Sequence, residues 1–296
     1  METPTDSQPG LLLRTLKLPL ARLLLLGAIL FYLYLSGNMF RAGFAKGWLM
    51  DLAVVAWMVL LTLAVYVGFV HVVERRKASE LSMPGMGREL GVGMLLGAGL
   101  YTVCIVVLMV FGVYRIDGFN SWQIPLGLLW FGLSSGFFEE MLFRGVLFRI
   151  GEEVFGSWVA LAVSSLAFGL IHLSNPGATM QGVLFIAIEA GVLLAAAYML
   201  TGRLWLGMGF HMAWNFTQSA IFPVHVSGSG TSQGLFKAAI AGPDLLTGGA
   251  FGMESSLVAF VLMTVTGMIL LLLAIRRGKI VPPSWMRSTT RPGSAM

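Results

Sequence analysis

Two adjacent glutamates followed by an arginine stand in an aromatic and apolar stretch, Phe137-Phe138-Glu139-Glu140-Met141-Leu142-Phe143-Arg144. On a helix, Glu140 and Arg144 lie one turn apart, in the orientation that favours an ion pair. Glu139 points about 100° away from that pair. One carboxylate is therefore paired, and the other is available to take a proton from water as a general base. The alternative is that both glutamates simply cap a helix end at a membrane interface.

Two further motifs place imidazoles on apolar helices. Phe168 and His172 are one turn apart near the end of an apolar run, a position that alone is typical of an interfacial histidine. His211 and Asn215 share one face near the middle of another run, where a plain helix–helix hydrogen bond is the alternative. At about 1.5 Å of rise per residue, Glu139 and both histidines reach one layer within the error of the expected helix ends. The three motifs together predict one polar site.

The elements that position these motifs must be membrane helices. The chain has 296 residues, of which 57% are hydrophobic and 11% charged, whereas soluble domains carry about 25% charged residues. Backbone groups in hydrocarbon must be satisfied internally, and long apolar runs without alternation favour helices over a barrel. We expect an all-α polytopic bundle of about eight spans: Leu20–Gly37, Leu49–Val73, Leu90–Tyr114, Ile124–Ile150, Ser157–His172, Gly182–Leu200, Leu204–Phe222 and Ser256–Ile275.

The distribution of basic residues predicts the orientation. With both termini in the cytoplasm, only Arg41, Lys46, Arg115 and Lys237 of the 19 lysines and arginines fall on the far side. This asymmetry is typical of the positive-inside pattern. The fourth span is overlong and carries charges near its end, so its second half is expected to be interfacial or a separate bent helix.

The same pattern suggests three regions. Residues 1–123 hold three spans and a charged cytoplasmic loop at 74–89, residues 124–222 form the core that carries the motifs, and residues 223–296 hold an external loop, the last span and a basic cytoplasmic tail. The net charge of +5 lies beside the apolar runs, which favours a lipid bilayer over a nucleic acid as the partner. Cys104 is the one cysteine, so no intramolecular disulfide is expected.

The three motifs, in this order, resemble the CPBP family of membrane peptidases, which includes type II CAAX prenyl endopeptidases and bacteriocin-processing or immunity proteins. The resemblance covers about residues 126–222. It implies an endopeptidase that cleaves a membrane-associated substrate, with lipidated and bacteriocin-like peptides as candidates. Carried over by position, Glu139 activates water and His172 holds or polarises it, while His211 and Asn215 stabilise the oxyanion. Glu140 and Arg144 tune Glu139, and Phe168 completes the second motif.

Three questions stay open at this stage. Glu139, His172 and His211 would make a three-ligand zinc site with one position left for water, but no His-Glu-x-x-His motif is present, so a metal-free reaction is expected. A non-catalytic immunity or scaffold protein is an alternative, and so is a proton-coupled transporter, although no repeated halves are evident. The bacterial plasma membrane is the expected location, with an internal eukaryotic membrane as the alternative.

Overall fold

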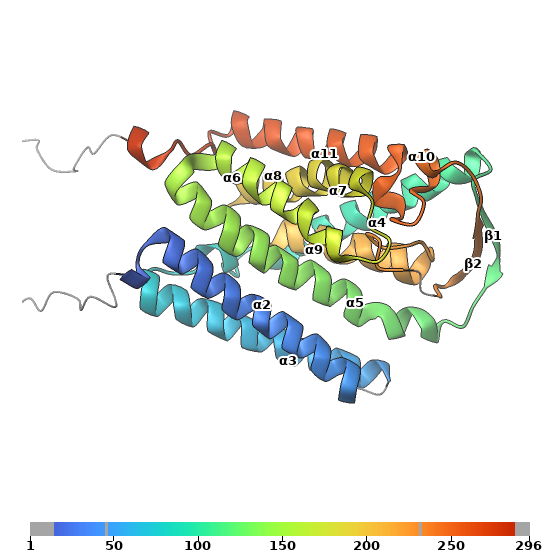
Figure 1. The fold of residues 1–296 in the computed structure, drawn as a ribbon, viewed down its shortest axis with the longest axis horizontal. Helices are drawn as coiled ribbons and strands as arrows, with labels where there is room; N and C mark the ends of the chain where they lie inside the picture. Colours follow the sequence, from blue (N-terminus) through green and yellow to red (C-terminus); the bar gives the residue numbers. More distant parts are fainter. Residues whose placement is uncertain (1–14, 45–46, 231–232, 288–296) are drawn as a thin grey trace, which may run out of the picture.

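The computed structural model describes residues 15–44, 47–230 and 233–287, and there the chain is a bundle of helices. Figure 1 shows long helices side by side, with the first and last described residues at the same end of the bundle. The helical, polytopic class expected from the sequence is confirmed. The α-helices are α2 (Pro19–Phe44), α3 (Trp48–Phe69), α4 (Met86–Val110), α5 (Gln123–Glu140), α6 (Arg149–Ile171), α7 (Met180–Ile186), α8 (Val192–Thr201), α9 (Trp205–Phe216), α10 (Asp244–Thr247) and α11 (Leu257–Arg276).

Four π-helical segments extend or join these helices. They are Val70–Glu74 after α3, Met141–Phe148 between α5 and α6, Ala187–Gly191 between α7 and α8, and Thr217–Ile221 after α9. A π turn departs from the regular α-helical hydrogen-bond pattern and is frequent at functional sites. Three of these segments lie beside the predicted motifs.

Six stretches of the described chain are long and apolar enough to cross a membrane: Pro19–Phe44, Trp48–Glu74, Met86–Val110, Gln123–Ser174, Met180–Thr201 and Leu257–Arg276. The longest contains Gly156, whose φ of 77° and ψ of 172° break the helix. Figure 1 shows α6 running back beside α5 after this turn. Helix α9 and the π segment Thr217–Ile221 form a further, shorter helical stretch. The count of eight spans and the orientation in the membrane stay predictions.

The second half of the fourth span continues the helix of its first half. The helix runs from Gln123 through the π segment as far as Gly156, and its arginines are buried in the bundle, while the position of this half relative to the membrane interface stays a prediction. Arg144 is fully buried and Arg149 is 6% exposed. The physical reason is pairing, because each arginine has a buried carboxylate partner that offsets the cost of removing its charge from water.

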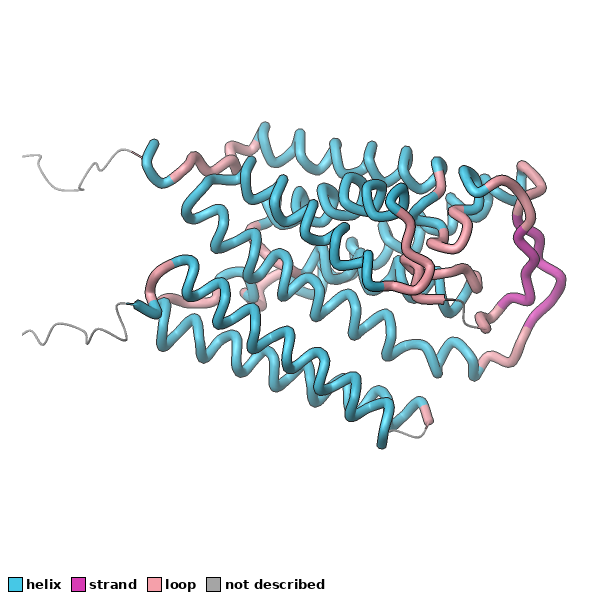
Figure 2. Tube along the Cα trace, viewed as in Figure 1, coloured by secondary structure: helices cyan, strands magenta, loops and turns pink. Residues whose placement is uncertain are grey.

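The structure also contains a small sheet that the sequence did not predict. Helix α4 ends at Val110, and Tyr114, expected within a span, instead begins strand β1 (Tyr114–Phe119). This strand pairs antiparallel with β2 (Phe236–Ile240), within the stretch expected to be a plain external loop. Figure 2 shows the two strands at the end of the bundle away from the termini. The sheet joins the loop after α4 to the loop after α9.

Glycines allow α9 to pack closely between α4 and α5. Gly93 and Gly97 of α4 face the α9 backbone. On the other side, Gly132 and Gly136 of α5 face Met212, and a Cβ at Gly136 would lie 2.5 Å from the Met212 nitrogen. Small residues four apart permit such close contact between helix backbones. This contact sets the face of α9 that carries His211 against the end of α5.

Candidate active site

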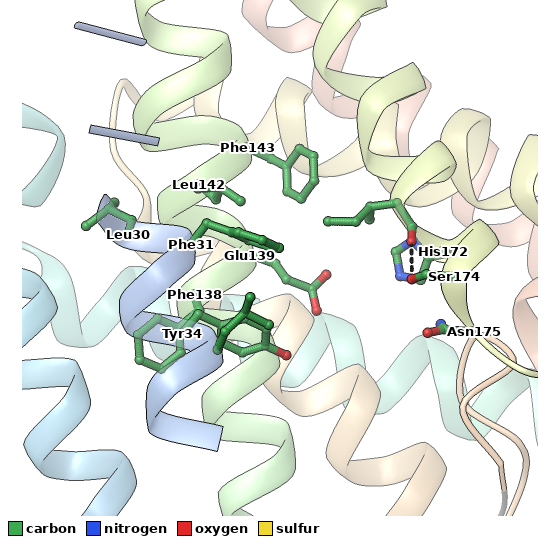
Figure 3. Close-up of a pocket in the computed structure, with 12 residues that line it drawn as sticks. Leu30, Phe31, Tyr34, Phe138, Glu139, Leu142, Phe143, His172, Ser174 and Asn175 are labelled. Carbon is green, nitrogen blue, oxygen red and sulfur yellow. Dashed lines mark hydrogen bonds between the residues drawn. The ribbon is translucent and has the colours of Figure 1, made fainter. Parts of the chain in front are cut away.

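Glu139 lines an open cleft with about 770 Å³ of free space, between α2, α5 and the end of α6. Figure 3 shows its carboxylate directed into the cleft, with His172 and Asn175 on the opposite wall. The Glu139 side chain is 22% exposed, so a substrate in the cleft could reach it. The lining residues are Leu30, Phe31, Tyr34, Leu35, Phe138, Glu139, Leu142, Phe143, Ile171, His172, Ser174 and Asn175.

Glu140 is buried and paired, as the helical spacing suggested. Arg144 donates from Nη1 to Glu140 Oε1 at 2.9 Å and from Nη2 to the Gly191 carbonyl at 2.9 Å. The arginine also lies over the Phe168 ring, 4.7 Å from its centroid. Gly191 ends the π segment Ala187–Gly191. The charge of Glu140 is therefore compensated, which leaves Glu139 as the carboxylate that faces the cleft.

His211 lies between the two glutamates. Its Nδ1 is 3.1 Å from Glu140 Oε1, and its Nε2 is 3.8 Å from Glu139 Oε2. Within the described chain, Glu139 Oε2 is buried and has no hydrogen-bond partner. Glu140 therefore fixes the orientation of the ring, as the buried carboxylate does in a catalytic triad, and directs Nε2 toward the unpaired oxygen of Glu139.

His172 is held by its own helix. Its Nδ1 lies 2.7 Å from the Phe168 carbonyl oxygen. Because a carbonyl only accepts, Nδ1 must carry the proton, and the Nε2 of a neutral ring is then an acceptor. The Phe168 ring packs edge-on to both imidazoles, with centroids 5.1 Å from His172 and 5.8 Å from His211. This phenylalanine fixes the spacing between the two histidines.

Asn215 lines an adjoining, smaller cavity. It donates from Nδ2 to Ser135 Oγ at 2.8 Å. The cavity is bordered by His172, His211 and Asn215, but not by Glu139. The structure thus distributes the four predicted residues over two neighbouring cavities, with His172 on the border of both.

Glu254 is a polar residue of this region that the motifs did not indicate. It accepts hydrogen bonds from Gln218 Nε2 at 2.7 Å and Ser227 Oγ at 3.1 Å. Asn175 in turn donates to the Ser227 carbonyl at 2.7 Å. Burial raises the pKa of the Glu254 carboxyl, although these hydrogen bonds act in the opposite direction. Glu254 therefore joins the long loop between α9 and α11 to the ends of both histidine-bearing helices.

Glu189 was also missed. It is fully buried on the π segment Ala187–Gly191, and in the described chain neither carboxylate oxygen has a hydrogen-bond partner. The signal that could have found it is an acidic residue inside the apolar run expected at Gly182–Leu200. Ionisable residues inside a span are functional candidates by default.

A buried cluster of Tyr66, Glu74 and Arg149 holds the π segment Met141–Phe148 in place. Tyr66 donates to the Gly145 carbonyl at 2.9 Å, and Arg149 Nε donates to the same oxygen at 2.8 Å. Arg149 also donates to both carboxylate oxygens of Glu74 at 2.9 Å. These contacts satisfy the carbonyl and fix the segment against α3.

Glu80 completes this cluster from the loop after α3. It accepts a hydrogen bond from Arg76 at 2.8 Å, and it shares the single proton of the Tyr66 hydroxyl with the Gly145 carbonyl. Burial acts to raise the pKa of Glu80, but the hydrogen bonds from Arg76 and Tyr66 and the charge of Arg149 outweigh it, so the pKa lies below its ordinary value.

The alternative zinc site would need Glu139, His172 and His211 to be placed around one metal ion. Among the described residues, no group of three or more histidine, cysteine, aspartate or glutamate side chains is placed to hold a metal ion. Glu139 Oε2 and His211 Nε2 are 3.8 Å apart. A reaction without a metal stays a prediction.

Comparison with protein families gives a match to part of the chain. Residues 120–217 match the family described as type II CAAX prenyl endopeptidase Rce1-like. The resemblance to the CPBP family is thus confirmed for this segment, which contains all three motifs. No curated protein and no solved structure matches the chain. Together with the apolar helices, the family match supports an integral, multi-pass membrane protease.

Proposed function

We propose that this protein is an intramembrane endopeptidase in which Glu139 activates the attacking water. The observation that carries this proposal is a carboxylate that, among the described residues, has no arginine or lysine partner and lines a mostly apolar cleft, opposite the imidazole of His172. Glu140 is committed to Arg144 and so is a poor candidate for the base. A general base must be able to reach the water it deprotonates, and Glu139 meets that condition.

The reaction follows from the orientation of these groups. A water in the cleft donates one hydrogen bond to Glu139 and the other to the acceptor Nε2 of His172. Its oxygen adds to the carbonyl carbon of the peptide bond, its proton passes to Glu139, and the π electrons move to the carbonyl oxygen. When the C–N bond breaks, Glu139 returns the proton to the leaving amine.

His211 and Asn215 are the proposed donors to the oxyanion. Asn215 uses one N–H on Ser135 and has a second one to offer. His211 donates from Nε2 as an imidazolium, a form that the two neighbouring carboxylates stabilise. Each donor of this kind contributes about 10²–10³ in kcat.

An apolar groove indicates the class of substrate. About 1190 Å³ of free space opens between α2, the π segment Met141–Phe148 and α6, with walls of aliphatic and aromatic side chains. It shares Phe31, Leu142, Phe143 and Ile171 with the catalytic cleft. An apolar anchor in this groove would place an attached peptide at Glu139. We therefore propose a lipid-anchored peptide as the substrate and a cellular membrane, expected to be the bacterial plasma membrane, as the location.

The test is cleavage of farnesylated, acylated and unlipidated peptides of one sequence by the purified full-length protein in detergent. Wild type is compared with Glu139→Gln, each with and without a chelator, and with Asp117→Asn as a matched control, because Asp117 lies on β1 and contacts Arg115 at the surface. We expect Glu139→Gln to abolish cleavage and Asp117→Asn to leave it unchanged.

The other outcomes are equally informative. Cleavage that survives Glu139→Gln would remove Glu139 as the base, and loss of cleavage with chelator would show that a metal is required. Equal cleavage of all three peptides would remove the role of the groove. No cleavage by wild type would favour a non-catalytic scaffold of the same fold.

A further inference from the structure

Tyr34 brings α2 into the candidate site, although α2 lies outside the matched segment. It lines the same cleft as Glu139 and His172, and its ring packs on Phe138 with centroids 5.3 Å apart. Figure 3 shows the phenol directed into the cleft, with its oxygen on the side of the Glu139 carboxylate. The Asn38 side chain, one turn further along α2, donates from Nδ2 to the Tyr34 carbonyl at 3.0 Å.

The cleft is short of neutral donors, which makes this hydroxyl significant. Nδ1 of His172 donates to a carbonyl, so the lone pair at its Nε2 is the one left to accept. Ser174 donates its hydroxyl to the Ile171 carbonyl at 2.8 Å, and Asn175 uses one N–H on Ser227. Of the described polar side chains that line the cleft, Tyr34 keeps a hydroxyl proton directed toward the reacting groups, and Asn175 on the opposite wall keeps its second N–H.

We propose that Tyr34 is a further catalytic residue, whose hydroxyl donates a hydrogen bond to the oxyanion formed when water adds to the peptide carbonyl. This inference rests on the proposed function. The oxyanion forms beside Glu139, because the attacking oxygen must be within reach of both the base and the carbonyl carbon. A tyrosine hydroxyl donates in its neutral form, so its contribution does not require the charged form of His211. The proton stays on Tyr34 throughout, and no bond to the phenol forms or breaks.

The test compares Tyr34→Phe with Tyr32→Phe. Phenylalanine keeps the ring that packs on Phe138 and removes only the hydroxyl. Tyr32 lies on the same helix but is 70% exposed, which makes it a matched control. With the farnesylated peptide as substrate, we expect Tyr34→Phe to lower kcat by about 10²–10³, with KM within about twofold of wild type and an unchanged thermal midpoint. Tyr32→Phe should match wild type.

A second measurement separates donation from packing. Replacing Tyr34 with 3,5-difluorotyrosine keeps the ring and makes the phenol more acidic, so the donor is lost at a lower pH. We expect kcat to fall on the alkaline side at a lower pH than in wild type, whereas a purely structural role would leave the pH profile unchanged.

Each outcome decides one of the two proposals. If Glu139→Gln abolishes cleavage while Tyr34→Phe stays within about threefold of wild type with an unchanged profile for the difluoro variant, the role of Tyr34 is wrong and the proposed function stands. If wild type is inactive, or Glu139→Gln is fully active, the proposed function fails and the inference fails with it. A Tyr34→Phe variant that raises KM alone would make Tyr34 a binding residue and overturn the oxyanion role.

Discussion

Replacing Arg144 with Met should destabilise the protein strongly, because it leaves a buried carboxylate without its partner. Glu140 is 1% exposed, and Arg144 is its buried cationic partner. Removing one member of a buried ion pair costs about 3–5 kcal/mol. The Gly191 carbonyl also loses the 2.9 Å hydrogen bond from Arg144, and an unsatisfied buried acceptor costs about 1–3 kcal/mol. The two penalties share one site, so we expect a total near the upper end of the first range, about 5 kcal/mol.

The double variant Glu140→Gln/Arg144→Met shows how much of the lost stability comes from the unpaired charge of Glu140. Glutamine keeps the shape of Glu140 without its charge, so the double variant should recover about half of the lost stability. These values correspond to an interaction energy of at least about 5 kcal/mol, above the range of about 0.5–3 kcal/mol that is usual for residues in direct contact, because each single variant leaves a buried charge unpaired. Glu140→Gln alone, which leaves Arg144 charged and buried, should also be less stable than the double variant.

Unfolding in detergent can be followed by tryptophan fluorescence, since the chain has 8 tryptophans. At about 2–4 °C per kcal/mol, Arg144→Met should lower the thermal midpoint by roughly 10–20 °C. Two results would refute the reasoning. A loss below about 1 kcal/mol would mean that Glu140 is neutral or hydrated in the folded protein, and a double variant as unstable as the sum of the singles would mean that the pair is not coupled.

Three further predictions concern the supports of the site. Gly136→Val should lower cleavage at least tenfold, because the added side chain would push Met212 and α9 away from α5. The control Gly127→Ala, with nothing within 4 Å of the added Cβ, should retain wild-type activity. Equal activity of the two variants would contradict the packing argument. Glu254→Ala should cost about 1–3 kcal/mol in thermal unfolding because it leaves its buried donors unpaired, and Glu254→Gln should cost less. The lowered pKa of Glu80 contributes stability above its unfolded value of about 4.3, and this is lost as pH falls through the folded pKa. The difference in thermal midpoint between wild type and Glu80→Gln should therefore shrink between pH 6 and pH 3, and a constant difference would disagree.

The features that the sequence predicted depend on local spacing. Hydropathy locates the helices because each span must satisfy its own backbone in lipid. The pair Glu140 and Arg144 is predictable because its members are four residues apart on one helix. The proximity of His211 to Glu139, with Nε2 and Oε2 3.8 Å apart, was suggested by equal depth in the membrane. Their roles in catalysis stay predictions.

The features that it did not predict depend on partners far along the chain. The burial of Arg149 was not predicted, because its carboxylate partner, Glu74, is 75 residues away and no local rule connects them. Strand β1 is six residues long, and its pairing with β2 joins segments on either side of the matched region. The direction of the Tyr34 phenol depends on how α2 packs against α5, which hydropathy does not determine.

The π-helical segments explain how such a polar site can exist in an apolar bundle. A buried arginine needs several acceptors, whereas in a regular helix each carbonyl already accepts one hydrogen bond from its own chain and keeps a single lone pair for another donor. The π segment Ala187–Gly191 provides carbonyls at Ala190 and Gly191, and Arg144 donates to them at 3.5 Å and 2.9 Å. Gly145, in the π segment after Glu140, provides the carbonyl that accepts from Tyr66 and Arg149. The departures from α-helical geometry thus lie where the buried arginines need acceptors, and the same contacts that satisfy these arginines hold Glu140 in place and leave Glu139 facing the cleft.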